Sequence, residues 1–155
     1  MCIRDRFQGL DCDTRAAQSE ALMLATIRSH DQYNTTIYGF NDRYRGINGR
    51  RDVVFMHKDD LQARGLSHGD LVDVEAIAAN DEAQPRVLAN LTAVEFDIAR
   101  NSAAAYYPEA NPLVALDSYD VRSGTPAYKS IPVRVRAAAA KNASAPIEPA
   151  EAVPV

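Results

Sequence analysis

The sequence predicts a single, mainly β domain folded as a small closed or nearly closed barrel. Short runs that alternate apolar and polar residues recur along the chain, as they do in half-buried strands. Clear start and stop signals mark one short helix, and polar loops separate the strands. A length of 155 residues, with 46% hydrophobic and 25% charged side chains, fits one soluble domain with one core.

Strands are expected at residues 22–28, 52–56, 71–78, 86–93, 113–116 and 132–136. A helix is expected at residues 58–64, since Asp59 and Asp60 lie near the positive end of its dipole and Gly65 can cap its last turn. Residues 14–20 are a candidate for a second short helix. Glycine-containing turns are expected at residues 48–49 and 68–70.

Both ends of the chain depart from this pattern. Residues 1–20 are expected to be irregular, with a truncated or non-native start, because they begin with neither a capped helix nor an alternating strand. Residues 137–155 are rich in Ala and Pro and are expected to be a disordered tail. The barrel is therefore expected within residues 21–136.

The charge of the chain restricts its partners. A net charge of -4 and a pI near 5.3 argue against nucleic-acid binding, which needs a basic face. Residues 26–51 nevertheless contain five arginines and two aspartates, and could attract a small anion. The chain has neither an 18-residue apolar run nor a signal-peptide pattern, so we expect no membrane span and a cytoplasmic location.

Catalytic and metal-binding patterns are weak. Cys2 and Cys12 have no metal-ligand or disulfide spacing, and the three histidines have no partner at helical spacing. Adjacent Ser29, His30 and Asp31 cannot form a catalytic triad, because neighbouring side chains point in different directions. We expect neither a catalytic residue nor a metal ligand in this chain.

Two polar loops that lie far apart in the sequence contain the candidate binding residues. The first supplies an arginine fork, hydroxyl groups, amides and a phenol, a set that suits a phosphorylated heterocyclic ligand: Arg28, Ser29, Gln32, Tyr33, Asn34 and Thr35. In the second, Pro108 and Pro112 stiffen the chain around Asn111, and Tyr128 and Lys129 follow with a ring and a mobile cation.

The chain resembles the C-terminal cofactor-binding domain of the molybdopterin oxidoreductases, and formate dehydrogenase-like alpha subunits in particular. The resemblance covers residues 20–136. It rests on Leu-Ala-Thr-Ile-Arg with its polar loop, on Asp-Leu-Gln-Ala-Arg-Gly-Leu-Ser-His-Gly-Asp-Leu-Val-Asp-Val, and on Pro-Glu-Ala-Asn-Pro-Leu with Ser-Gly-Thr-Pro-Ala-Tyr-Lys. Order and spacing agree throughout.

The resemblance implies a six-stranded double-psi β-barrel, of the aspartate-decarboxylase type, that binds molybdopterin guanine dinucleotide. The first loop would line the pterin–pyrophosphate path, Asn111 would present its amide to the pterin, and Lys129 would lie near a phosphate or the pterin. Molybdenum or tungsten would be held by the cofactor, and any iron–sulfur cluster by a part N-terminal to this chain. The partners implied are the remaining domains of the same oxidoreductase, with the substrate bound elsewhere and no catalysis by this chain alone.

Two alternatives stay open on the sequence alone. One is a stand-alone barrel for binding or assembly, such as the substrate-recognition barrels of AAA ATPases, without redox activity. The other is a small aspartate-decarboxylase-type enzyme, which is less favoured because its Gly-Ser cleavage site appears only in reverse order, at Ser123 and Gly124.

Overall fold

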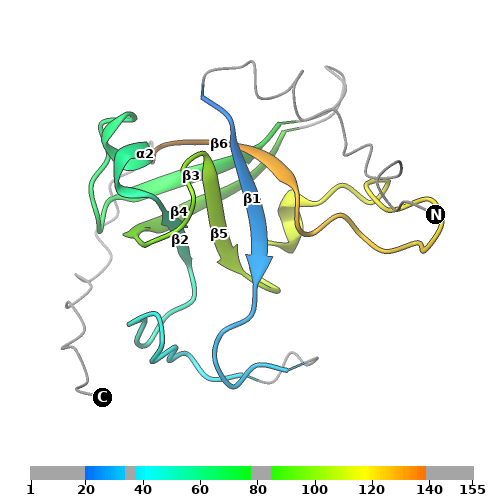
Figure 1. The fold of residues 1–155 in the computed structure, drawn as a ribbon, viewed down its shortest axis with the longest axis horizontal. Helices are drawn as coiled ribbons and strands as arrows, with labels where there is room; N and C mark the ends of the chain where they lie inside the picture. Colours follow the sequence, from blue (N-terminus) through cyan, green and yellow to red (C-terminus); the bar gives the residue numbers. More distant parts are fainter. Residues whose placement is uncertain (1–19, 34–37, 78–84, 139–155) are drawn as a thin grey trace, which may run out of the picture.

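A computed structural model describes residues 20–33, 38–77 and 85–138. In these ranges six strands close into a barrel in the order β1-β5-β2-β4-β3-β6 (Figure 1). The strands are β1 (Leu22–Ile27), β2 (Val53–Met56), β3 (Leu71–Ala76), β4 (Arg86–Glu95), β5 (Ser102–Tyr106) and β6 (Ile131–Ala137). The expected mainly β, six-stranded barrel is confirmed.

Strand direction decides which loops share an end of the barrel. β1 runs parallel to β5, with Ile27 opposite Tyr106, so both strands finish at the same end. β2 is antiparallel to β5 and β6 is antiparallel to β1, so these two strands begin there. We call this end, where β1 finishes at Ile27, the Ile27 end.

The barrel interior follows from the alternation visible in the sequence. Leu22 and Leu24 of β1, and Val72 and Val74 of β3, are almost completely buried, whereas their neighbours in each strand are only half-buried. Successive side chains of a strand point to opposite faces, so one set fills the barrel and the other covers its wall. This regular pattern made these strands predictable.

β5 was not predicted, because its sequence is Ser-Ala-Ala-Ala-Tyr and alanine is uncommon in strands. Ala103 and Ala105 nevertheless face the barrel core and are 3% and 2% exposed. Backbone pairing with both β1 and β2 holds this segment as a strand. Tertiary packing therefore overrides the weak local preference.

The strand expected at residues 113–116 is wrong. Asn111–Leu113 form a short 3-10 helix, η2, whose Pro112 has no N–H for strand pairing and whose Leu113 is buried. The chain then extends outward as an arm, residues 115–127, and its two sides meet at a bridge between Tyr119 and Pro126. Figure 1 shows this arm in yellow to orange, projecting beside the barrel.

The expected helix is present as α2, Lys58–Gln62, two residues shorter than predicted. His57 caps its start, where the Nδ1 atom accepts a hydrogen bond from the Asp59 N–H at 3.1 Å. It ends through Gly65, whose positive φ of 66° lets the Leu66 N–H reach the Leu61 carbonyl. Across the ranges that the structure covers, no helix is long and apolar enough to cross a membrane.

The turn expected at residues 48–49 lies slightly earlier, at residues 43–46, between the bridged Asp42 and Ile47. Gly49 instead forms a bend with a φ of 69°, held by a hydrogen bond from its N–H to Asn41 Oδ1. The turn expected at residues 68–70 is observed, at residues 68–69. The candidate helix at residues 14–20 and most of the expected tail lie outside the described residues, while β6 runs through Ala137.

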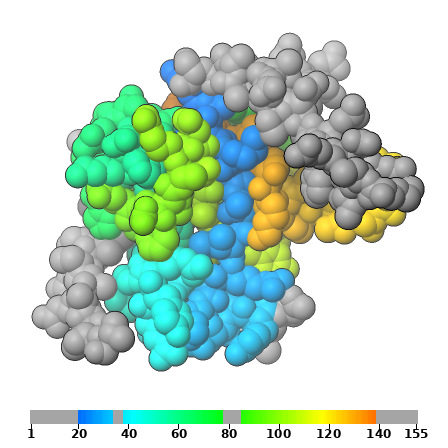
Figure 2. All heavy atoms as spheres, in the orientation of Figure 1, coloured from blue at the N-terminus to red at the C-terminus, as the bar shows by residue number. Residues whose placement is uncertain are grey.

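A second apolar cluster lies on the outer wall of the barrel, around the Phe55 ring. That ring makes edge contacts with Phe96 and Tyr106, at centroid distances of 5.2 and 5.5 Å. Ile47 packs into the same cluster and is 2% exposed. The segment that leads into β2 is thereby anchored to the barrel, and Figure 2 shows it in cyan beside the blue loop after β1.

We predict that Asp60→Ala lowers the free energy of unfolding by about 1–3 kcal/mol, measured by urea denaturation. The Asp60 side chain is buried and accepts a 2.6 Å hydrogen bond from the Asn101 N–H, tying α2 to the turn before β5. The matched control is Asp59→Ala, whose half-exposed carboxylate should matter by no more than about 0.5 kcal/mol. Equal losses in the two variants would contradict this assignment.

Candidate functional site

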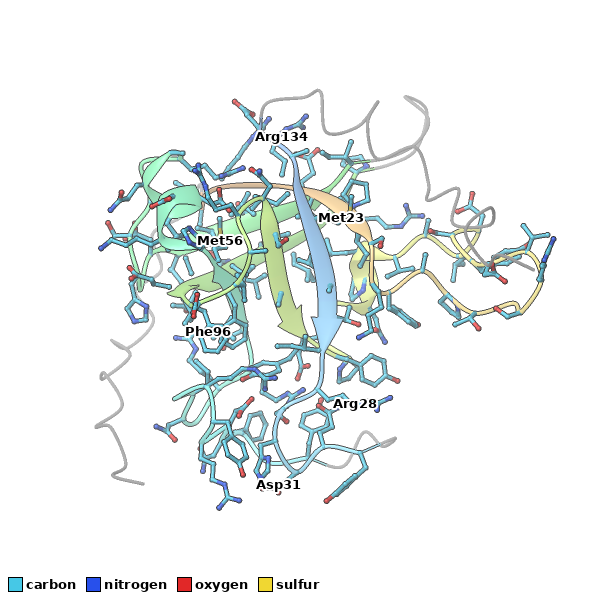
Figure 3. All side chains as sticks on the ribbon, in the orientation of Figure 1. Met23, Arg28, Asp31, Met56, Phe96 and Arg134 are labelled. Atoms are coloured by element: carbon cyan, nitrogen blue, oxygen red, sulfur yellow. The ribbon has the colours of Figure 1, made fainter. Side chains whose placement is uncertain are left out.

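Four segments far apart in the sequence meet at the Ile27 end: the loops after β1 and β5, and the segments before β2 and β6. The loop after β5 is joined to β1 by a hydrogen bond from the Tyr107 N–H to the Ile27 carbonyl, at 2.7 Å. The segment before β6 is joined to β1 by the Thr26 N–H and the Tyr128 carbonyl, at 2.9 Å. Figure 3 shows Arg28 just beyond the end of β1, with Asp31 farther along the same loop. The two polar loops seen in the sequence are thus brought together.

Arg51, directly before β2, is the centre of a hydrogen-bond network at this end. Its side chain is only 2% exposed. The guanidinium forks the Glu109 carboxylate, with Nε to Oε1 at 2.6 Å and Nη2 to Oε2 at 3.2 Å. It also donates to Ser29 Oγ at 2.6 Å, to Gln32 Oε1 at 2.9 Å and to the Tyr107 carbonyl at 2.7 Å.

Two aromatic rings cover the faces of the same guanidinium. The Arg51 Cζ atom lies 3.8 Å from the Tyr38 ring centroid and 4.6 Å from that of Tyr106. Such cation–π contacts favour a charged group that has been removed from water. Burial and the nearby Glu109 carboxylate raise the pKa of Tyr38 above its ordinary value, so its ring stays neutral.

Ser29 and Gln32 belong to this network. Both residues are buried, at 6% and 5% exposure. The Ser29 N–H donates to Gln32 Oε1 at 3.2 Å, and Gln32 Nε2 donates to the Tyr107 carbonyl at 2.9 Å. The Gln32 side chain therefore fixes the loop after β1 against the loop after β5, and Ser29 is held in the same network by Gln32 and Arg51.

A second polar group lies beside the first. Asp42 Oδ2 accepts hydrogen bonds from Arg45 Nη1 at 2.5 Å and from the Tyr106 hydroxyl at 2.9 Å. Burial alone would raise the pKa of Asp42, but these hydrogen bonds outweigh it and hold that pKa below its usual range. Burial and the Asp42 carboxylate raise the pKa of Tyr106. Arg45 also reaches the Arg28 carbonyl at 3.2 Å.

The arginine-rich segment is less positive in three dimensions than in sequence. Arg45 pairs with Asp42, and Arg50 forks Asp52 at 2.8 and 2.6 Å. Arg51 is neutralised by Glu109, and Arg43 bonds the His30 ring at 2.9 Å. Asp52 and Glu109 lie outside residues 26–51, so the charges counted in that segment overstated its positive potential. In the described parts of the chain, the exposed Arg28 side chain makes no hydrogen bond or ion pair.

The other predicted binding residues are placed as follows. Tyr33 is 77% exposed, and the half-buried Tyr128 ring meets the Tyr107 ring edge-on at 6.1 Å. Lys129 Nζ donates a hydrogen bond to the Thr26 carbonyl. Asn34 and Thr35 lie outside the described residues.

Asn111 is one of four described residues with a buried side-chain polar atom that lacks a hydrogen-bond partner, and the others are Asp42, Arg64 and Thr92. It begins η2 directly after the loop from β5, and its Oδ1 atom is buried with no hydrogen-bond partner among the described residues. A buried acceptor without a donor costs about 1–3 kcal/mol, so such atoms in native proteins call for an explanation.

Sequence reasoning missed Arg51 as the centre of the network, together with Tyr38, Asp42, Tyr106 and Glu109. The signal that could have revealed Arg51 is its place directly before the apolar run of β2, where a charged residue is buried only if it is paired. Nothing in the sequence pairs it with Glu109, which is 58 residues away. That contact exists because β2 and β5 are neighbours.

Residues 22–132 match the protein family described as Molydopterin dinucleotide binding domain. The match covers all of β1 to β5 and the beginning of β6, and it includes both polar loops. The chain belongs to this family. The resemblance seen in the sequence is thereby confirmed at the level of the family.

Two curated relatives extend the comparison. Over 128 residues the chain is 43% identical to Protein YdeP of Escherichia coli (strain K12), a match that spans 83% of this chain and 17% of the relative. Over 116 residues it is 47% identical to Uncharacterized oxidoreductase Rv2900c of Mycobacterium tuberculosis (strain ATCC 25618 / H37Rv), spanning 74% and 15%. The chain therefore corresponds to a small part of each relative.

We predict that Asp42 contributes to the acid sensitivity of the fold. Because its folded pKa lies below the unfolded value of 3.8, its contribution is complete above that pH and is lost as the pH falls toward the folded pKa. Asp42→Asn should therefore lose less stability than the parent chain between about pH 5 and pH 3, measured by urea unfolding at each pH. Asp117→Asn, at an exposed site, is the control. An unchanged acid slope in Asp42→Asn would contradict the prediction.

Proposed function

We propose that the Ile27 end binds molybdopterin guanine dinucleotide, and that this chain serves a larger molybdopterin oxidoreductase as its cofactor-binding part. The buried, unpartnered Asn111 Oδ1 is the observation that carries the proposal, because it faces no donor in the described chain. Membership of the dinucleotide-binding family supports the ligand class, and the name of the mycobacterial relative supports the oxidoreductase setting. The match to that family counts against a stand-alone barrel with another task.

The ligand and the site are chemically complementary. A dinucleotide carries a pyrophosphate, to which the exposed Arg28 guanidinium can donate charge-assisted hydrogen bonds. A pterin or guanine ring offers N–H donors, which an amide oxygen such as Asn111 Oδ1 can accept. We propose direct contact for the remaining predicted side chains as well: Tyr33, Asn34, Thr35, Tyr128 and Lys129. Ser29 and Gln32 shape the loop that presents Arg28.

When bound, the cofactor carries the metal and supplies the redox chemistry, while the protein orients it and adjusts its surroundings. This chain's part is to hold the phosphate and heterocycle groups at the Ile27 end. We propose that the remaining domains of the same enzyme supply the metal ligand, any iron–sulfur cluster and the substrate pocket. The guanine form of the cofactor and a formate dehydrogenase-like reaction rest on the sequence resemblance, and the cytoplasmic location stays a prediction.

We predict that Arg28→Ala weakens binding of molybdopterin guanine dinucleotide by roughly 1.5–3 kcal/mol, since a hydrogen bond to a charged group is lost. Asn111→Ala should also weaken it, because the amide that contacts the ring is removed. Equilibrium dialysis with the isolated cofactor, followed by fluorescence of the oxidised pterin, gives the affinity.

The control is Arg100→Ala. Arg100 is a 62% exposed cation just before β5, at the opposite end of the barrel from the proposed site. Its loss changes the net charge of the chain as Arg28→Ala does. Equal affinity in all variants, or an equal loss in Arg28→Ala and Arg100→Ala, would remove Arg28 from the site.

A further inference from the structure

We propose that Arg51 is a positioning residue for dinucleotide binding: it fixes the loops after β1 and β5 relative to each other, so that Arg28 and Asn111 face one ligand. This inference rests on the proposed function. It concerns a residue that would not touch the cofactor, and it assigns the pair of buried Arg51 and half-buried Glu109 a task beyond stability.

The geometry of Arg51 leaves it unavailable to a ligand. Its side chain is 2% exposed, and its hydrogen-bonding edge meets a carboxylate, a hydroxyl, an amide oxygen and a backbone carbonyl. The faces of the guanidinium are covered by Tyr38 and Tyr106. An anion that bound Arg51 would have to displace Glu109. Arg51 therefore acts through its contacts within the protein.

What Arg51 joins is the reason for the proposal. On one side it bonds Ser29 and Gln32, in the loop that begins with Arg28. On the other side it bonds the Tyr107 carbonyl and Glu109, in the loop that leads to Asn111. Arg28 and Asn111 are thus each within two positions of a group held by Arg51.

Local hydrogen bonds carry this restraint from Glu109 to Asn111. The Ala110 N–H donates to the Tyr106 carbonyl at 2.9 Å, and the Asn111 N–H donates to the Pro108 carbonyl at 2.9 Å. Ala110 is completely buried. The stretch between the pair and Asn111 therefore has little freedom, and a shift of Glu109 moves the Asn111 amide with it.

The substitution Arg51→Lys tests whether Arg51 acts through its positive charge or through its hydrogen-bonding geometry. Lysine keeps the positive charge opposite Glu109, so the half-buried carboxylate keeps an oppositely charged partner. Its compact ammonium has three donors and no planar fork, so it cannot hold both loops and both rings at once. A residue that acts only through its charge would tolerate this exchange, and a positioning residue would not.

The neighbouring arginine is a matched control. Arg50 precedes Arg51 in the same segment and makes a bidentate ion pair with Asp52. That pair is local, spanning two residues, and its carboxylate is 55% exposed. Arg50→Lys therefore makes the same chemical change without releasing the loops after β1 and β5.

The experiment compares Arg51→Lys with Arg50→Lys in two measurements. Affinity for isolated molybdopterin guanine dinucleotide should fall by about tenfold or more in Arg51→Lys, as expected for loss of charge-assisted hydrogen bonds. It should change by less than about twofold in Arg50→Lys, as at an ordinary surface site. Amide hydrogen exchange, measured without ligand, should speed up at residues 29–32 and 107–111 together, while β3 and β4 keep their protection.

Glu109→Gln gives an independent test if Arg51→Lys does not fold. It should weaken binding in the same direction. Where Arg51→Lys folds, the double variant should lose no more affinity than Arg51→Lys alone, because both substitutions act on one link. Unchanged affinity in Arg51→Lys overturns the inference, and so does a loss accompanied by faster exchange throughout the barrel. If the parent chain and Arg28→Ala both fail to bind the cofactor, the proposed function is overturned instead.

Discussion

The parallel pairing of β1 with β5 is the constraint on which the site depends. It places Ile27 opposite Tyr106, so that the loops after both strands leave the barrel at the same end. Arg51 then enters this end because β2 is antiparallel to β5. If β1 and β5 were antiparallel, the two polar loops would emerge at opposite ends of the barrel. The direction and order of the strands therefore determine where the site lies, before any side chain contributes to it.

The network around Arg51 shows how polar groups can be buried at such a place. A buried charge is tolerated when it is paired and hydrogen-bonded, and Arg51 meets both conditions. Much of the arginine charge in the segment before β2 is neutralised by Asp42, Asp52 and Glu109. Among the described residues from 26 to 51, the exposed Arg28 and Arg43 lack a carboxylate partner, which favours directed contacts with an anion over a diffuse attraction.

Most of the barrel was predictable, because β1, β3 and β6 have apolar residues at strand spacing and β2 and β4 contain short, mostly apolar runs. β5 was not, since its alanines acquire a reason to be in a strand only beside β1 and β2. The two polar loops were recognised from residue types alone. The pairing of Arg51 with Glu109 could not be, because a contact between residues 58 positions apart depends on strand neighbours that one sequence does not reveal.

The alanines of β5 also set a limit on how this protein can vary. Ala103 and Ala105 face the packed interior, while Ala104 packs against the outer cluster around Phe55. A larger side chain at Ala103 or Ala105 would press on a filled layer, since tightly packed interiors accommodate added volume poorly. The alanine-rich strand β5 is thus among the segments least free to change, whereas the sequence of the exposed arm can vary far more between related proteins.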